Sequence, residues 1–140
     1  AVWVTTGKSI ATLQKSHRFE DEPFNALKIG LYLDRSRLYD RINARARGMI
    51  QAGLLEEVQG LLDKGYSGDL KSMQSIGYRH MARYISGKST WDEAVRTLKR
   101  DTRRYAKRQL TWFNADKEIH WQEPDHLDLI VDRVQAFVVS

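Results

Sequence analysis

Hydrophobic residues along the chain follow two spacings, one typical of strands and one typical of helices. Positions 27, 29, 31 and 33 are leucine or isoleucine and alternate with polar or small residues, which predicts a strand ending at Asp34. Ile119-His120-Trp121 predicts a second short strand. Two short strands form a poor sheet by themselves. We therefore expect them to belong to a larger α/β unit.

A spacing of three and four residues predicts the helices, and capping residues mark two of their starts. Asp34 or Ser36 can cap the first helix after the strand. Thr90 and Glu93 have the spacing of a capping box for the longest helix. The predicted helices cover about 34–53, 54–65, 73–86, 90–114 and the segment from Pro124 onward, with a shorter one over 10–15 and a loop over 16–25. In the last helix we expect these residues to face inward: Leu127, Ile130, Val131, Val134 and Phe137.

Composition narrows the class of protein. The 140 residues suggest a single domain, and the chain contains no cysteine, which excludes disulfide scaffolds and cysteine-based zinc sites. No apolar run approaches the roughly 20 residues of a membrane helix. The net charge of +5 favours an anionic partner such as nucleic acid. The first residue is Ala1 rather than methionine, and we expect further sequence upstream.

The longest predicted helix carries most of the informative charge. Its cations are Arg96, Lys99, Arg100, Arg103, Arg104, Lys107 and Arg108. Four of them, at 96, 100, 103 and 107, follow steps of four, three and four and therefore share one face, where like charges repel mildly. This face is either a solvated helix surface or a binding track for the phosphates of a nucleic acid.

The end of this helix mixes cations, an amide, a hydroxyl and aromatic rings: Lys107, Arg108, Gln109, Thr111, Trp112 and Phe113. RNA recognition uses such a mixture, with cations for phosphates and aromatic rings for stacked bases. The alternative for Trp112 and Phe113 is packing in the core. The cations and the amide are poor core residues because burying them unpaired is costly.

Two further segments are candidates for phosphate binding. The first contains Gln74, Ser75, Ile76, Gly77, Tyr78 and Arg79, where a glycine permits close backbone approach and a helix start offers free N–H groups. Its alternative is a helix cap with a packed tyrosine. The second is the arginine face of Arg37, Arg41 and Arg45. Its alternative is surface pairing with Asp40, Glu56 or Glu57.

Other signals are weak. Gly7-Lys8-Ser9 matches the end of a phosphate-binding P-loop, but that motif needs a glycine five residues earlier, where Val2 stands. The histidines at 17, 80, 120 and 126 show no metal-ligand spacing, so no metal site is predicted. We identify no self-contained catalytic group.

Several motifs together resemble the C-terminal half of the tRNA dimethylallyltransferase family, also called tRNA isopentenylpyrophosphate transferases. The most specific are Ser75-Ile76-Gly77-Tyr78-Arg79 and Lys107-Arg108-Gln109-Leu110-Thr111-Trp112. The others are Thr6 to Ser9, Leu38 to Ile42, Arg45, Met49 and Gly53 to Val58. The resemblance covers nearly the whole chain. It implies an α/β fragment, mostly helical, whose two strands belong to a P-loop-kinase-like parallel sheet.

The family resemblance also implies a reaction. Such enzymes transfer a dimethylallyl group from dimethylallyl diphosphate to N6 of an adenosine beside the anticodon, after flipping that base into a channel. A carboxylate acts as general base there, while the P-loop and Mg²⁺ hold the diphosphate. The family's tRNA-binding segments correspond to Gln74–Arg79 and Lys107–Phe113. Arg103 is added to these candidates from the basic face of the longest helix. Arg45 and Arg41 are candidates for a diphosphate or phosphate contact.

The chain departs from the family pattern in two ways. Asn114 stands where many members carry arginine, and we find neither a P-loop, nor the catalytic aspartate segment, nor the helical insertion. We therefore expect no catalytic residue and no bound metal in this chain, a cytoplasmic location, and inactivity on its own. Its exposed strand edges could support a dimer. The alternatives are a stand-alone basic RNA-binding module without catalysis and a helical domain that binds an acidic protein.

Overall fold

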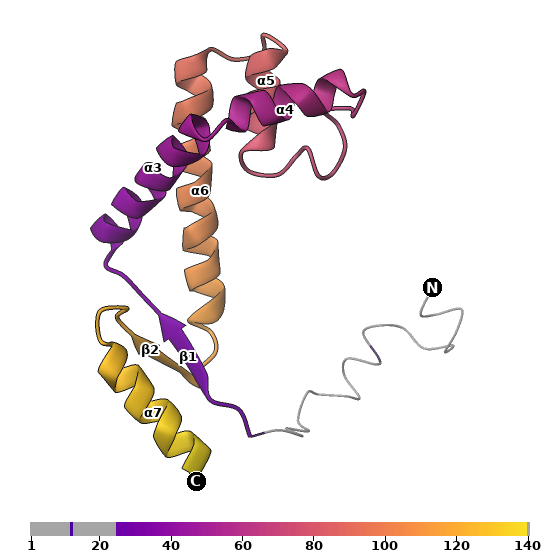
Figure 1. Cartoon of the computed structure of the whole chain (residues 1–140). Helices are drawn as coiled ribbons and strands as arrows, with labels where there is room; N and C mark the ends of the chain where they lie inside the picture. Colours follow the sequence, from indigo (N-terminus) through magenta and orange to yellow (C-terminus); the bar gives the residue numbers. More distant parts are fainter. Residues whose placement is uncertain (1–11, 13–24, 140) are drawn as a thin grey trace.

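Five helices and two strands make up the described part of the chain, which comprises residue 12 and residues 25–139 in a computed structural model (Figure 1). In order they are β1 (Lys28–Leu31), α3 (Arg35–Gln51), α4 (Leu54–Asp63), α5 (Tyr78–Ile85), α6 (Trp91–Phe113), β2 (Ile119–Gln122) and α7 (Leu127–Val139). The mostly helical α/β prediction is confirmed. Two predictions lie outside the described residues. They are the helix over 10–15, of which only Thr12 is described, and the loop over 16–25, of which only the last residue is described.

The two strands form a parallel pair. Lys28 lies opposite Ile119 and Leu31 opposite Gln122. Parallel strands need a long crossover, and α3 to α6 provide it. A Cβ atom at Gly30 would lie 2.6 Å from Cε3 of Trp121 and 2.7 Å from Cγ2 of Ile119. Glycine is therefore required where these two side chains cross the first strand.

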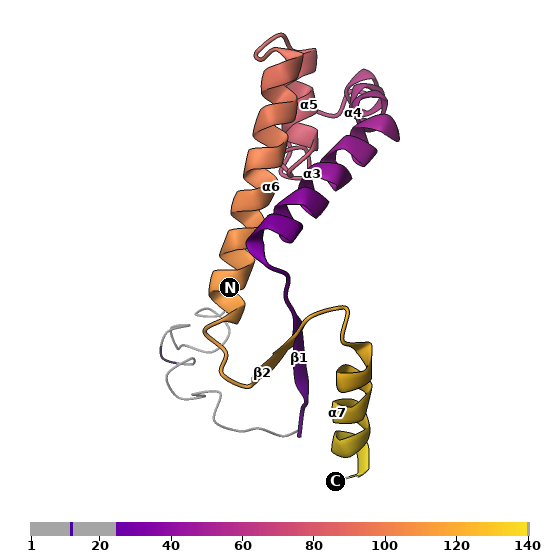
Figure 2. The same ribbon diagram turned by 90° about the vertical axis from the view of Figure 1, so that its left-hand side faces the viewer.

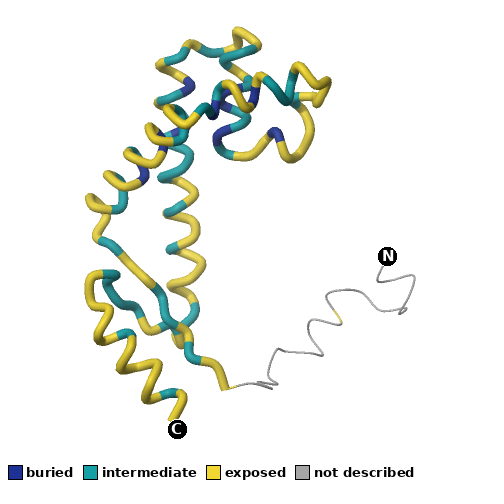
Figure 3. Tube along the Cα trace, in the orientation of Figure 1, coloured by how far each residue is buried: buried dark blue, intermediate teal, exposed yellow. Residues whose placement is uncertain are grey.

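The core lies at the helical end of the molecule, where α3, α4, α5 and the first half of α6 meet (Figures 1 and 3). Its buried residues are Ala46, Leu54, Val58, Met73, Met81, Ala94 and Leu98. Four of them, Val58, Met81, Ala94 and Leu98, are at most 1% exposed. The apolar stripes of these helices therefore account for the packing of the helical end.

The predicted caps are present. The carboxylate of Asp34 accepts hydrogen bonds from the backbone N–H groups of Ser36 (2.9 Å) and Arg37 (3.1 Å), so Asp34 rather than Ser36 caps α3. These bonds lower the pKa of Asp34. The hydroxyl of Thr90 accepts from the N–H of Glu93 at 3.2 Å and caps α6, but the Glu93 side chain makes no hydrogen bond back to Thr90, so only half of the predicted capping box is present.

The predicted start of α5 near Met73 is wrong. The helix begins at Tyr78, and residues 71–77 form turns. Gly77 has a φ angle of 106°, a conformation that a right-handed helix cannot contain. The apolar residues before it still join the core, which explains why the hydrophobic pattern suggested a longer helix.

The prediction for the last helix also needs correction. α7 begins at Leu127 rather than at Pro124 and buries none of its side chains. Leu127 is 65% exposed, and Val131 and Val134 are also exposed, whereas Ile130 and Phe137 are half-buried. The helix lies beside the two-stranded sheet (Figure 2), and the described residues supply no layer that covers its apolar stripe.

Candidate nucleic-acid interface

The segment Gln74–Arg79 forms the turn that leads into α5. Gly77 at its centre is buried, and a Cβ atom there would lie 3.7 Å from Cε of Met49 and 3.8 Å from the side chain of Leu54. Its backbone N–H donates to Nδ1 of His80 at 3.3 Å. Positive φ, burial and this hydrogen bond together fix the path of the turn.

The side chains of this turn divide into packed and exposed groups. Ile76 and Tyr78 pack against the core, and the Tyr78 hydroxyl donates to Glu57, a bond that raises the pKa of Tyr78. Gln74 and Ser75 are exposed, although Nε2 of Gln74 donates to the carbonyl of Gly68 at 2.7 Å. The alternative of a cap with a packed tyrosine thus describes Tyr78, while two polar residues remain accessible to a ligand.

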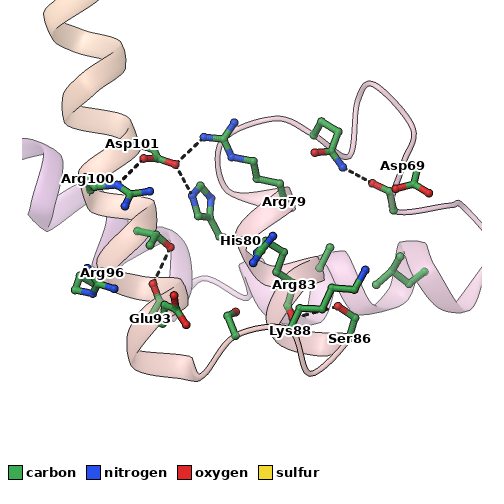
Figure 4. Close-up of a pocket in the computed structure, with 16 residues that line it drawn as sticks. Asp69, Arg79, His80, Arg83, Ser86, Lys88, Glu93, Arg96, Arg100 and Asp101 are labelled. Atoms are coloured by element: carbon green, nitrogen blue, oxygen red, sulfur yellow. Dashed lines mark hydrogen bonds and ion pairs between the residues drawn. The ribbon is translucent and has the colours of Figure 1, made fainter.

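Asp101 of α6 ties this turn to the long helix (Figure 4). Its carboxylate accepts from Arg79 at 2.8 Å, from Arg100 at 2.9 Å and from Nε2 of His80 at 3.2 Å. The hydrogen bond from Arg100, followed by those from Arg79 and His80, holds the pKa of Asp101 well below its ordinary value. Asp101 was not among the residues singled out from the sequence, because two of its three partners, Arg79 and His80, lie on α5, more than 20 residues earlier in the chain.

His80 is only 4% exposed and connects Asp101 to Gly77. Because the Gly77 N–H points at Nδ1, the proton of the neutral ring lies on Nε2 and is donated to Asp101. Burial lowers the pKa of His80, and the nearby charge of Arg79 acts in the same direction. The sequence analysis considered this histidine only as a metal ligand; its structural partners could not be inferred from spacing.

The end of α6 presents an exposed surface. Trp112 is 73% exposed and Phe113 is 40% exposed, so the core-packing interpretation is wrong for Trp112 within the described structure. The two rings meet edge to face with centroids 4.8 Å apart. They border an apolar cavity of about 640 Å³ that the sheet lines with Ile119 and Trp121. Flat aromatic surface is therefore available at this end of the helix.

The polar residues of this segment are mostly accessible. Lys107 and Gln109 are exposed, and their side chains make no hydrogen bond or ion pair with the described residues. The guanidinium of Arg108 lies 5.7 Å from the ring centroid of Tyr105, and the hydroxyl of Thr111 donates to the Lys107 carbonyl at 3.0 Å. The segment thus offers two cations and an amide on the surface of α6.

Arg103 differs from the other cations of its helix face. Its guanidinium donates to Oδ1 of Asn43 at 3.3 Å and lies 5.5 Å from the ring centroid of Tyr39, both on α3. Arg100 is engaged by Asp101, whereas Arg96 and Lys107 have no such partner in the described part of the chain. Of the four cations on this face, the two in the middle, Arg100 and Arg103, are thus held by other side chains, while the two at its ends, Arg96 and Lys107, are unpaired within the described residues.

The arginine face of α3 is also mixed. Arg37 is paired at the surface, as the alternative to phosphate binding predicted, but its partners are Asp125 at 2.6 Å, Glu123 at 3.8 Å and Asp34 at 3.9 Å. The partners named from the sequence, Asp40, Glu56 and Glu57, are wrong for Arg37. Arg41 and Arg45 are exposed. Within residues 25–139 the Arg45 side chain has no ion-pair partner, which leaves it accessible to an anion.

Both predicted RNA-binding segments are connected to α6: the turn through the bond from Arg79 to Asp101, and Lys107–Phe113 as the last residues of the helix. Arg79 is fixed to Asp101, and Lys107 follows Asp101 by six residues, which corresponds to about 9 Å of helix rise. The turn and the end of α6 are therefore held at a fixed separation.

Comparison with known proteins identifies the family. The family model described as IPP transferase matches residues 1–116. The chain belongs to this family. It is 50% identical over 137 residues to tRNA dimethylallyltransferase 2 of Geotalea uraniireducens and 52% identical over 133 residues to tRNA dimethylallyltransferase 2 of Syntrophus aciditrophicus. These matches cover 97% and 95% of the chain but only 44% and 43% of the relatives.

Solved structures of IPP transferases show the same fold. The tRNA isopentenylpyrophosphate transferases of Staphylococcus epidermidis and Bacillus halodurans superpose with TM-scores of 0.76 and 0.75, at 35% and 34% identity. The matches cover 97% and 99% of this chain, and 45% and 50% of those structures. The chain thus spans about half the length of the proteins it matches.

Proposed function

We propose that this chain is the tRNA-binding C-terminal part of an enzyme that transfers a dimethylallyl group to N6 of the adenosine beside the anticodon. In that reaction the N6–carbon bond forms, the carbon–oxygen bond to diphosphate breaks, and N6 loses a proton to a base. The remaining part of the enzyme supplies the base and the site for dimethylallyl diphosphate. This chain supplies RNA contacts from Gln74–Arg79 and Lys107–Phe113.

The observation that carries the proposal is the joint attachment of both segments to α6. Asp101 fixes Arg79 beside this helix, and the helix ends in exposed Trp112 and Phe113. An aromatic platform and cations at a fixed separation suit a single-stranded loop, in which bases stack on rings while phosphates meet cations. The names of the relatives support tRNA as that RNA.

Three further expectations belong to this proposal. The described residues contain no cluster of three histidine or acidic side chains that could hold a metal ion, so we assign the Mg²⁺ of the complete enzyme no ligand here. None of the described helices has the length and apolar character of a membrane span. The cytoplasmic location of the enzyme stays a prediction from the family resemblance. The open edges of the two-stranded sheet suit further strands of the complete enzyme, or a dimer of the isolated chain.

A chimera tests the proposed activity. This chain replaces the matching 44% of the Geotalea uraniireducens relative, and transfer from labelled dimethylallyl diphosphate to an unmodified anticodon stem-loop is measured. We expect the chimera to label the stem-loop at the target adenosine. The control is the relative without its matching segment, which should not label the RNA.

The alternative of a stand-alone RNA-binding module predicts a different result. Its supporting observation is the set of exposed cations without partners, which would bind any RNA through phosphates. A folded chimera that binds the stem-loop but never alkylates it would support this alternative and contradict the enzyme proposal. Failure to bind RNA at all would favour an acidic protein partner.

A further inference from the structure

A cavity of about 730 Å³ lies between α5, the start of α6 and the turn before α5 (Figure 4). Five cations line it: Arg79, Arg83, Lys88, Arg96 and Arg100. The carboxylates in its wall belong to Asp69, Glu93 and Asp101. Cations thus exceed carboxylates, and the cavity is distinct from the exposed end of α6.

Asp101 divides these cations into two groups. It accepts hydrogen bonds from Arg79 and Arg100 and so offsets their charge. The side chains of Arg83, Lys88 and Arg96 make no hydrogen bond or ion pair with the residues that the structure describes. We call these three residues the cavity cations. Each is exposed, so its charge remains available to a ligand that enters the cavity.

A hydroxyl in the cavity wall also lacks a partner. Oγ of Ser89 is buried and makes no hydrogen bond with the described residues. Buried polar atoms without a partner are rare in folded proteins. A hydroxyl donates readily to an anionic oxygen, so Ser89 adds a neutral donor between Lys88 and the start of α6.

We propose that the cavity binds phosphate groups of the RNA backbone, beyond the two segments already assigned. This inference rests on the proposed function. Figure 4 shows the cavity cations spread along the walls of the cavity instead of converging on one point. That arrangement fits successive phosphates of a strand better than one small anion. Arg79 belongs to both the cavity wall and the turn Gln74–Arg79, so the same RNA can contact both.

Charge removal in the 140-residue chain tests the site. The cavity variant combines Arg83→Gln, Lys88→Gln and Arg96→Gln. The control variant combines Arg47→Gln, Lys64→Gln and Arg133→Gln, which removes the same charge from exposed residues outside the cavity. Binding of a fluorescein-labelled, unmodified anticodon stem-loop is measured by anisotropy over a series of salt concentrations.

We expect the cavity variant to bind about 10- to 100-fold more weakly at low salt, with a salt slope flatter by about two to three. The control variant should lose about threefold or less. Circular dichroism and thermal unfolding confirm that each variant is folded. If the cavity variant does not fold, Lys88→Gln alone replaces it, with an expected slope change of about one.

Each outcome decides the proposal. If both variants lose RNA affinity equally, or if the salt slope of the cavity variant is unchanged, the cavity site is wrong. As long as the wild type binds the stem-loop, that result leaves the proposed function intact. If the wild type does not bind the stem-loop, both the site and the proposed function fail. If inorganic phosphate raises the melting temperature of the wild type only, yet both variants bind RNA equally, the cavity takes a free anion and the RNA proposal is wrong.

Discussion

The helical end and the sheet end of the chain are built in opposite ways. At the helical end four helices bury a continuous core that includes Val58, Met81 and Leu98. At the sheet end two short strands and α7 leave large apolar side chains exposed, among them Leu31 at 57% and Leu127 at 65%. Figure 3 shows the contrast directly: buried positions gather at one end of the molecule.

This difference indicates which end is complete within the described residues. The helical end has its own core, whereas the parallel strands lack the covering layers that such strands usually have. α6 runs through both ends and connects the two proposed RNA-binding segments. Asp101 anchors the turn Gln74–Arg79 at the helical end, and Lys107–Phe113 lies exposed toward the sheet end. The packing of the helical end thus fixes the position of the proposed RNA-binding surface.

Truncating the core should produce the largest effect on stability. Met81→Ala removes a fully buried side chain from the helical end, and we expect a loss of about 2–5 kcal/mol in the free energy of unfolding. The matched change Val138→Ala, at a position 75% exposed in α7, should alter it by about 0.5 kcal/mol or less. Urea unfolding measures both variants. Equal effects would remove the distinction between the two ends.

A change in the sheet should act locally. Gly30→Ala places a Cβ atom against Trp121 and Ile119, which should destabilise the sheet end by about 1–3 kcal/mol. Hydrogen exchange should increase in β1 and β2 while the core amides of α4 and α5 stay protected. Faster exchange throughout the helices would show instead that both ends unfold as one unit.

Removing an exposed ring should separate binding from folding. Trp112→Ala should leave the free energy of unfolding within about 0.5 kcal/mol, because the side chain is 73% exposed. It should weaken binding of the anticodon stem-loop by about 1–3 kcal/mol through the loss of base stacking. The control Tyr66→Ala removes another exposed ring, away from α6, and should not change binding. A folding defect without a separate binding defect would contradict a stacking role.

Protonation of His80 should have the smallest effect on the free energy of unfolding. Its pKa in the folded chain is lowered by burial, so the unfolded state takes up the proton first as pH falls. The contribution of His80 to stability is complete above about pH 6.5 and is lost as pH falls toward the folded pKa. Protonation also places a second N–H group against the N–H of Gly77.

His80→Gln tests this pH dependence, because a glutamine oxygen can accept from Gly77 without titrating. Urea unfolding at pH 7.5 and pH 5.5 should show a larger loss in the wild type than in the variant. Since the other three histidines are present in both proteins, their contributions cancel. Parallel pH dependence of the two proteins would show that His80 does not titrate in this range.

Local signals in the sequence predicted most elements of the fold. The alternating pattern located β1 and β2, and Asp34 and Thr90 marked the starts of two helices. The start of α5 was predicted too early because the apolar residues before Gly77 pack in the core although they lie in a turn and not in a helix. Leu127, Val131 and Val134 of α7 were wrongly predicted to face inward, because an amphipathic pattern shows which face of a helix can pack but not whether a partner is present.

The candidate site was only partly predictable. Motifs identified the turn Gln74–Arg79 and the end of α6, because their residue types are unusual in combination. Asp101 and His80 could not be found in this way, since their role depends on contacts across 21 residues of chain. The engagement of Arg103 by Asn43, 60 residues away, was hidden for the same reason.

The most direct test of the account compares two RNAs. Anisotropy titration of the chain with an unmodified anticodon stem-loop and with a scrambled hairpin, at two salt concentrations, measures recognition apart from general charge attraction. We predict a preference for the stem-loop that survives at the higher salt concentration. Equal binding of both RNAs that disappears at the higher salt concentration would contradict specific recognition by this chain.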